Sequence, residues 1–466
     1  MHNEQQISLF DDVKELKQKQ TKITNKDINE LIGIKETFEL PDKLIKILLN
    51  EEEKDKLLNK FLEYDIDLKY DFLRDYFQEQ HSNRNDLKQD YTPDCICEIL
   101  SRLKKDNNKI LDVCSGTGAL TISNLYNNKI YVQCEELSSR SIPVLLLNLI
   151  IRNVDGLVVQ KDVLKNEITT IYKLESTDQF SNIKIVDELQ EEKFDIIVSN
   201  PPYSLGWEPK YDERFYGYEL APKSKADYAF ILDIVYRLSN NGQAFIILPH
   251  GVLFRGASEE KIRKQLIENN LIDSIIGLPD KLFMNTQIPT LILVLNKNKK
   301  TNDVLFIDSS KNCIKKSKQN DMNEEHINKI ISTYRERKEI EKYSHLASYE
   351  EIVKNDYNLN IPRYVDTSEE KKLPDLKEVV KDIIEIDNEI EKVNKELKEL
   401  VEQLEGTNPE SKKYYEEAIK PFLEWLVWKR YEWRTIWNLS TSNIKKNNDV
   451  KFIKRYKKRY GCMYVV

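Results

Sequence analysis

The chain has 466 residues, of which 40% are hydrophobic and 32% are charged, and its formal net charge is −7. This length leaves room for two or three domains, and the composition excludes collagen-like and low-complexity classes. No apolar run approaches the roughly 20 residues of a membrane-spanning helix. With its charged composition, we expect the protein to be soluble. The six cysteines are too scattered for a disulfide framework or a zinc site, so we expect a protein of the reducing cytoplasm without a metal ion.

The N-terminal part of the chain predicts a tail followed by a helical domain. Residues 1–20 are polar and predict a flexible tail. Residues 21–88 carry apolar residues at helical spacing, and we expect an N-terminal helical domain there. Within it, residues 23–35 are compatible with a helix-turn-helix that turns at Gly33, but a simple pair of helices is the preferred interpretation.

Residues 89–365 alternate short, β-branched apolar segments with amphipathic ones. Helices are expected near residues 95–105 and 141–153. The expected strands are residues 109–115, 129–135, 157–162, 194–200, 244–250, 273–279 and 290–297. Strands that alternate with helices predict an α/β domain, with a mostly parallel sheet covered by helices on both faces.

Residues 366–406 predict a coiled-coil helix. Apolar residues recur at heptad spacing, and they are Leu376, Val379, Ile383, Ile386, Ile390, Val393, Leu397, Leu400 and Leu404. A single apolar stripe must be covered by another helix, either in this chain or in a partner, and we favour a partner. Residues 407–466 form a basic, aromatic tail, which we interpret either as a nucleic-acid-binding segment or as a solvated extension.

A glycine turn follows the first predicted strand, and carboxylates follow the next two. The segment Leu111–Gly118 reads Leu-Asp-Val-Cys-Ser-Gly-Thr-Gly, and its glycines allow the backbone to approach a ligand closely. The spacing matches neither a dinucleotide loop nor a phosphate loop. Glu136, preferred to its neighbour Glu135, is placed to accept both ribose hydroxyls of a nucleoside, and Asp162 to accept an adenine amino group. The alternative for Glu136 is an exposed charge at a strand end.

The motif that indicates the reaction class is Asn200-Pro201-Pro202-Tyr203, directly after an apolar strand. Two prolines remove two backbone donors and fix the chain as it leaves the sheet. A backbone carbonyl and the Asn200 amide oxygen then become acceptors for an amino group on an aromatic ring. Those two bonds withdraw the nitrogen lone pair from conjugation with the ring, and Tyr203 offers a face on which the ring stacks. A mere turn is the disfavoured alternative.

In this order, the motifs resemble those of the S-adenosylmethionine-dependent amino-methyltransferases of the gamma arrangement, which have a Rossmann-like core. More closely, residues 89–365 resemble the modification subunit of type I restriction–modification systems, an N6-adenine DNA methyltransferase. The resemblance also rests on Gln89–Pro93 and on residues 248–297, 304–311 and 355–365.

The resemblance implies S-adenosylmethionine as the cofactor and a set of site residues. The cofactor-binding residues that it implies are Tyr91, Thr92, Pro93, Asp112, Ser115, Gly116, Thr117, Gly118, Glu136 and Asp162. The catalytic residues that it implies are Asn200, Pro201, Pro202 and Tyr203. Tyr91 to Pro93 would line the methionine end of the cofactor, and Asp112 with Gly116 would hold its amino acid part. Phe283 would cover the other face of the target base, with core packing as the preferred alternative.

The implied activity is site-specific methylation of N6 of an adenine that is flipped out of double-stranded DNA. Apart from the basic tail the chain is acidic, which makes it a poor general binder of DNA. By the resemblance, a specificity subunit that packs on the heptad helix 376–404 would read the DNA sequence. Separately, Gln6–Phe10 resembles the motif by which bacterial proteins dock on the replication sliding clamp.

Three other functions are compatible with parts of the sequence. A stand-alone adenine methyltransferase with its own target recognition is the principal alternative. A protein glutamine methyltransferase uses the same Asn-Pro-Pro-Tyr logic, but those enzymes are usually shorter. A catalytically silent DNA-binding or scaffold subunit is disfavoured by the intact glycine loop and Asn200.

Overall fold

The computed structural model describes most of the chain in eight segments. They are residues 21–81, 91–104, 109–125, 130–190, 192–284, 288–367, 375–404 and 407–422. Gln6–Phe10 and the tail beyond residue 422 lie outside these ranges, so the sliding-clamp motif and the role of the tail stay predictions. The contacts divide the chain into two units, Met1–Ser368 and Glu369–Val466. Within the described segments, no helix is both long and apolar enough to cross a membrane.

The chain enters the first unit through a group of short helices. They are α2 (Asn25–Ile32), α3 (Leu40–Leu48), α4 (Glu51–Leu62) and α5 (Arg74–His81), with a 3-10 turn at Thr37–Glu39. Helix α2 begins with a capping box between Thr24 and Asp27 and ends at Gly33, whose φ of 76° is in the left-handed region. The apolar side of α3 is buried and packs on the helix α9 (Ile142–Ile150) of the core. The predicted helical region is therefore present, and α3 serves to attach it to the core.

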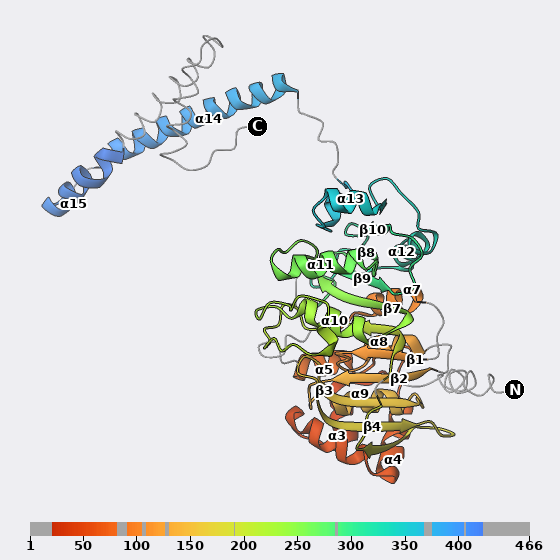
Figure 1. The fold of residues 1–466 in the computed structure, drawn as a ribbon. Coiled ribbons are helices and arrows are strands. Elements are labelled where there is room, and N and C mark those ends of the chain that lie inside the picture. Colours follow the sequence, from red (N-terminus) through yellow and green to blue (C-terminus); the bar gives the residue numbers. More distant parts are fainter. Residues whose placement is uncertain are drawn as a thin grey trace. The chain divides into compact units, whose positions relative to one another are not determined.

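One mixed sheet organises the rest of the unit (Figure 1). Its strands are β1 (Lys109–Val113), β2 (Tyr131–Glu136), β3 (Gly156–Asp162), β4 (Glu167–Glu175), β5 (Asn182–Val186), β6 (Phe194–Ser199), β7 (Leu238–Pro249), β8 (Ile272–Gly277), β9 (Thr290–Asn296), β10 (Val304–Asp308) and β11 (Ser344–Ala347). Their order across the sheet is β11-β10-β8-β9-β7-β6-β1-β2-β3-β4-β5. The central neighbours β7-β6-β1-β2-β3 are parallel, and β9, β11 and the β4–β5 hairpin add antiparallel pairs around them.

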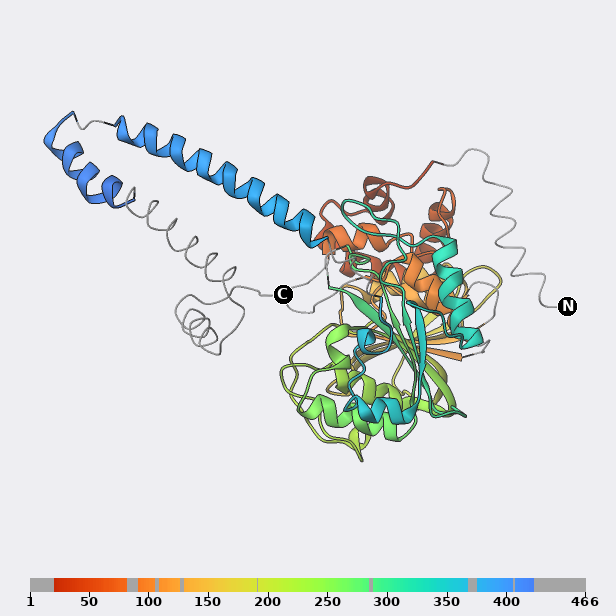
Figure 2. The same ribbon diagram turned by 90° about the horizontal axis from the view of Figure 1, so that it is seen from above.

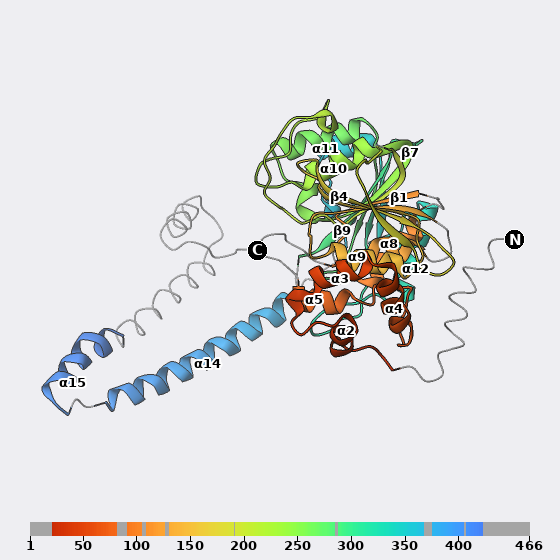
Figure 3. The same cartoon turned by 90° about the horizontal axis from the view of Figure 1, so that it is seen from below.

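Helices cover both faces of this sheet, as the alternating pattern predicts. They are α7 (Asp94–Leu103), α8 (Ala119–Leu125), α9, α10 (Asp227–Arg237), α11 (Ser258–Glu268), α12 (Glu324–Glu336) and α13 (Tyr349–Lys354). Short 3-10 turns lie at Glu213–Phe215, His250–Leu253 and Ile361–Arg363. Figures 2 and 3 show α10 and α11 on one face and α8, α9 and α12 on the other, with the N-terminal helices stacked outside α9. Two separate apolar cores result, one on each face.

The connections reverse direction between β1 and β6. From β1 the chain moves through α8 to β2 and then to β3, whereas from β6 it moves through α10 to β7 on the other side. Helices α8 and α10 therefore leave the sheet on opposite faces, and a crevice opens between the carboxyl ends of β1 and β6. The fold thus places a binding site at the ends of the strands that carry the glycine loop and Asn200.

The second unit contains the long helix α14 (Leu376–Glu402), then α15 (Pro409–Tyr414) and a π-helical turn at Tyr415–Ile419. A helix therefore forms where the heptad pattern predicts one. Its stripe includes large apolar side chains that are exposed, namely Ile383, Ile386, Ile390, Val393, Leu400 and Leu404. The pairing of this stripe with another helix stays a prediction.

Candidate active site

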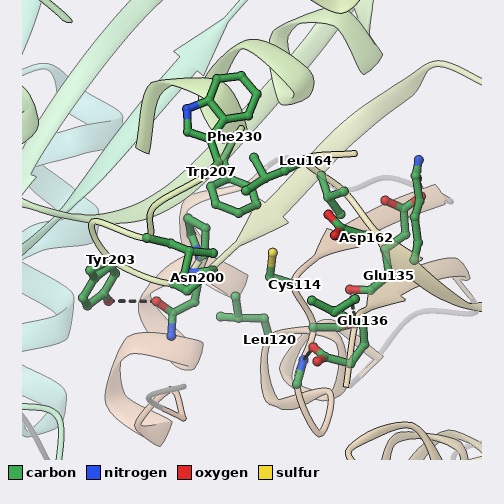
Figure 4. A pocket seen from close by; sticks show the side chains of 18 of the residues that line it. Cys114, Leu120, Glu135, Glu136, Asp162, Leu164, Asn200, Tyr203, Trp207 and Phe230 are labelled. Carbon is green, nitrogen blue, oxygen red and sulfur yellow. Dashed lines mark hydrogen bonds and ion pairs between the residues drawn. The ribbon is translucent and has the colours of Figure 1, made fainter. Parts of the chain in front are cut away.

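A cavity of about 310 Å³ lies at the carboxyl ends of β1, β2, β3 and β6 (Figure 4). Most of the predicted site residues line it, and they are Tyr91, Thr92, Ser115, Gly116, Thr117, Glu136, Asp162, Asn200, Pro201, Pro202 and Tyr203. In Figure 4, Asn200 and Tyr203 stand on one side, Glu136 and Asp162 on the opposite side, and Cys114 between them. Four predicted residues, Pro93, Asp112, Gly118 and Phe283, lie outside this lining.

The glycine loop after β1 has a conformation that favours its sequence. Gly116 has a φ of 57° and Gly118 a φ of 94°, and even Cys114 is left-handed with a φ of 62°. A Cβ added to Gly118 would lie 2.7 Å from the Leu145 side chain, whereas one added to Gly116 would lie 3.4 Å from the Tyr91 ring. A side chain at Gly118 would therefore strain the left-handed backbone and displace Leu145 of α9, whereas at Gly116 the strain would come from the backbone alone.

The two adjacent glutamates of β2 both line the cavity but have different partners. Glu135 is buried and accepts two hydrogen bonds of 2.6 Å from the guanidinium of Arg237. Although burial raises the pKa of Glu135, Arg237 and Lys161 outweigh it and the pKa is lowered. Glu136 instead accepts from the backbone N–H groups of Gly116 and Ser138, each at 2.8 Å, and lies on the cavity wall. Glu135 is thus a structural ion-pair member, whereas the Glu136 carboxylate is aligned by the loop itself.

Asp112 lies beneath the glycine loop rather than on the cavity surface. Its Oδ2 accepts a 2.7 Å hydrogen bond from the Thr121 hydroxyl, but its buried Oδ1 has no hydrogen-bond partner. Burial raises the pKa of Asp112 to about 7, and the negative charge of Glu136 contributes. The buried Tyr91 hydroxyl also has no hydrogen-bond partner. Unpaired buried polar atoms are costly. Tyr91 lines the cavity, so its hydroxyl fits a site that is completed by a polar ligand, whereas Asp112 lies outside the lining.

The Asn-Pro-Pro-Tyr corner leaves β6 as the sequence predicts. The Asn200 amide nitrogen donates to the Thr92 hydroxyl at 3.0 Å, and its Oδ1 accepts from the Tyr203 hydroxyl at 2.8 Å. Phe283 is buried outside the cavity lining and packs edge-on against Tyr203, with 6.2 Å between ring centroids. In this structure Phe283 therefore supports the Tyr203 ring from the core, in agreement with the core-packing alternative.

A buried ion pair supports the same corner from behind. Asp227, at the start of α10, accepts the backbone N–H of Ser204 at 2.8 Å. Its other oxygen accepts from Arg255 at 2.9 Å, and Arg255 lies 3.2 Å from Glu259 of α11. Ser204 has a φ of 50°, so its backbone is held in a conformation that a serine rarely adopts. Arg255 and Glu259 belong to the segment 248–297, which was noted for its resemblance but not assigned a role.

One wall of the cavity is apolar, and its residues were not predicted from the sequence. Leu137, Leu164, Trp207 and Phe230 line it, and Figure 4 shows Leu164, Trp207 and Phe230 together on one side. Leu137 follows Glu136 directly, and Leu164 lies two residues after Asp162. Because both leucines stand next to predicted strand-end carboxylates, the sequence could have predicted that they line the cavity. Trp207 and Phe230, in contrast, reach the cavity only because the loop after β6 and helix α10 fold back over it.

Comparison with known proteins gives one family. The sequence profile described as N-6 DNA Methylase matches residues 67–373. The chain is 31% identical over 314 residues to the type I restriction enzyme MpnII methylase subunit of Mycoplasma pneumoniae, covering 64% of this chain and 56% of that protein. It is 30% identical over 413 residues to the type I restriction enzyme MjaVII methylase subunit of Methanocaldococcus jannaschii, covering 78% and 67%. The matched regions thus span between about half and two thirds of these relatives.

A solved structure resembles the fold. The type I restriction–modification system methyltransferase subunit from Streptococcus thermophilus superposes with a TM-score of 0.57 at 32% sequence identity. The match covers 74% of this chain and 80% of that one.

Proposed function

Because this chain belongs to the N-6 DNA methylase family, we propose that it is a DNA adenine methyltransferase. It transfers a methyl group from S-adenosylmethionine to the N6 atom of an adenine in double-stranded DNA. It acts as the modification subunit of a type I-like restriction–modification system, as the names of its relatives suggest.

One observation carries this proposal. A single cavity is lined both by the glycine loop with Glu136 and Asp162 and by the Asn-Pro-Pro-Tyr corner. The first group suits a nucleoside that carries an amino acid, and the second suits an aromatic amine. Binding groups for a methyl donor and for its acceptor thus share one enclosed space, which is the arrangement that a direct transfer needs.

When bound, S-adenosylmethionine supplies a methyl group that is already activated by a positively charged sulfur. In this chain the glycine loop would hold its amino acid part, and Asp112 lies beneath that loop. Glu136 accepts the ribose hydroxyls, and Asp162 accepts the adenine amino group. The apolar wall of Leu137, Leu164, Trp207 and Phe230 excludes water from the ring.

The Asn200 Oδ1 and the Pro201 carbonyl hold the target amine and draw its lone pair out of conjugation. An amide oxygen can accept two hydrogen bonds, so the Tyr203 hydroxyl does not by itself exclude the amine. Thr92 accepts from the amide nitrogen and keeps the oxygen end directed at Tyr203. The adenine must leave the DNA stack to reach this corner, at a cost of a few kcal/mol, and Tyr203 offers a stacking surface in return.

The test is formation of N6-methyladenine in digested DNA, measured by mass spectrometry. Asn200→Ala should lower the rate by about 10²–10³, because it removes one acceptor aimed at charge that develops in the transition state. Asn241→Ala is the matched control, since Asn241 is exposed near the amino end of β7, away from the cavity. Wild-type rates in a folded Asn200→Ala variant would contradict the proposal.

The exposed stripe of α14 supports the choice of partner. Ile386 and Ile390 are each more than half exposed on a helix of 27 residues, and a stripe of this kind is stabilised by packing against another helix. We assign it to the specificity subunit that reads the DNA sequence.

The partner is tested by adding a specificity subunit from the same host. The chain alone should not methylate a defined site, whereas the complex should. Ile386→Asp with Ile390→Asp should prevent assembly in analytical ultracentrifugation. Asn388→Asp introduces a charge on the opposite side of the helix and should leave assembly unchanged. Site-specific methylation by the lone chain would favour a stand-alone enzyme instead.

A further inference from the structure

We propose that Asp71, a residue of the N-terminal helical region, is a positioning residue that holds the glycine loop in its ligand-binding shape. The inference rests on the proposed function, because that function assigns the loop to the cofactor. Its consequence is that the N-terminal region and the cofactor site are coupled, so that a ligand in the cavity stabilises the segment around Asp71.

Asp71 lies between α4 and α5, is buried, and reaches the loop directly. Its Oδ2 accepts a 2.6 Å hydrogen bond from the Thr117 hydroxyl. Its Oδ1 accepts from the Asn148 amide nitrogen at 2.9 Å and from the Leu73 backbone N–H at 3.1 Å. The same Asn148 nitrogen donates to the Thr117 carbonyl at 2.9 Å. Thr117 is therefore held by both its side chain and its backbone.

Arg152, just after α9, fixes the orientation of Asn148. Its Nη1 donates to the Asn148 carbonyl at 2.5 Å and to the Asn148 Oδ1 at 3.2 Å. The guanidinium also donates to the carbonyls of Leu68 and Tyr70, at 2.9 Å and 2.7 Å. Because arginine only donates and a carboxylate only accepts, the Asn148 nitrogen must face Asp71. The network thus has one consistent arrangement.

The position of this network in the site indicates more than support of the fold. Thr117 lines the cavity and follows Gly116, whose N–H aligns the Glu136 carboxylate. Asp71 does not line the cavity, so it acts on a ligand only through the loop. Apolar residues would fill a buried space at lower cost than a carboxylate, for which burial raises the pKa. A buried acceptor is useful here because it selects a single loop conformation.

The experiment measures S-adenosylhomocysteine binding by isothermal titration calorimetry on the full chain. Asp71→Ala should weaken binding about tenfold, because the loop loses its anchor and a charge-assisted hydrogen bond. Asp71→Asn retains an acceptor for Asn148 and should bind within about threefold of wild type. Asp75→Ala is the control: Asp75 is exposed four residues away, and its variant should bind like wild type.

Two further measurements distinguish positioning from a general loss of stability. In wild type, S-adenosylhomocysteine should slow hydrogen exchange at residues 71–77, as coupling between sites requires. In a double-mutant cycle, the loss caused by Thr117→Val should shrink in the Asp71→Ala background. Wild-type affinity in folded Asp71→Ala, or unchanged exchange at residues 71–77, would overturn the inference. Wild type that binds no S-adenosylhomocysteine would instead overturn the proposed function on which it rests.

Discussion

Replacing Asp112 with asparagine should make the stability of the ligand-free protein less dependent on pH. Asp112 is buried, one of its oxygens has no hydrogen-bond partner, and burial raises its pKa from the ordinary value of 3.8 to about 7. A folded-state pKa above the unfolded one means that stability is fully present below pH 3.8 and is lost as pH rises to about 7. Asparagine is nearly isosteric, can still accept from Thr121, and has no charge to bury.

The size of the effect follows from the shift. One pKa unit corresponds to about 1.4 kcal/mol, so a shift of about three units predicts a difference of up to about 4 kcal/mol at pH 8. Relaxation and water entry reduce this figure, which is an upper limit. The advantage of Asp112→Asn should therefore grow between pH 5 and 7 and then level off.

The assay is urea denaturation of wild type and Asp112→Asn without ligand at pH 5, 6, 7 and 8. Thr121→Val serves as a comparison, because it removes the hydroxyl that donates to the Asp112 carboxylate and should destabilise the charged form further. A free-energy difference between wild type and Asp112→Asn that stays constant over this pH range would refute the reasoning, because it would mean that the Asp112 pKa is not raised.

Three other substitutions have defined outcomes. Gly118→Ala should lower the free energy of unfolding by about 2–4 kcal/mol in urea denaturation, because the φ of 94° disfavours a side chain and the new Cβ would lie 2.7 Å from Leu145. A loss of less than about 0.5 kcal/mol, which is typical of a neutral surface substitution, would contradict this. Arg237→Ala should lower the free energy of unfolding by about 3–5 kcal/mol, since it leaves buried Glu135 without its bidentate partner. An unchanged denaturation midpoint would show that this ion pair does not stabilise the fold. Asp227→Ala should lower the methylation rate more than it weakens S-adenosylhomocysteine binding, because it releases Ser204 next to the Asn-Pro-Pro-Tyr corner. Equal effects on the rate and on binding would indicate general damage.

Elements with strong local patterns were predictable. Each strand expected from the sequence is present, as are the helices at residues 95–105 and 141–153 and the heptad helix. These segments carry β-branched runs or amphipathic periods that determine structure within about ten residues. The strands β4, β5, β10 and β11 were not predicted, and all four lie at the two edges of the sheet, outside its parallel centre.

The candidate site likewise contains residues that the sequence predicts and residues whose contacts only the tertiary structure reveals. The preference for Glu136 over Glu135 rests on spacing. The structure adds that the Glu135 carboxylate is paired with Arg237, which lies 102 residues away in the chain. Phe283 could not be placed from its neighbours, because its contact with Tyr203 joins segments 80 residues apart.

By itself the sequence determined the strand-end motifs, since a glycine turn, two carboxylates and a double proline each express a local backbone or chemical preference. Only the tertiary structure decided which of these motifs share a cavity and what supports them. The reversal between β1 and β6, the Asp71 contact to Thr117 and the Asp227 contact to Ser204 all join residues that are remote in the chain. Such contacts depend on the order in which the strands pair across the sheet, and no local sequence pattern encodes that order.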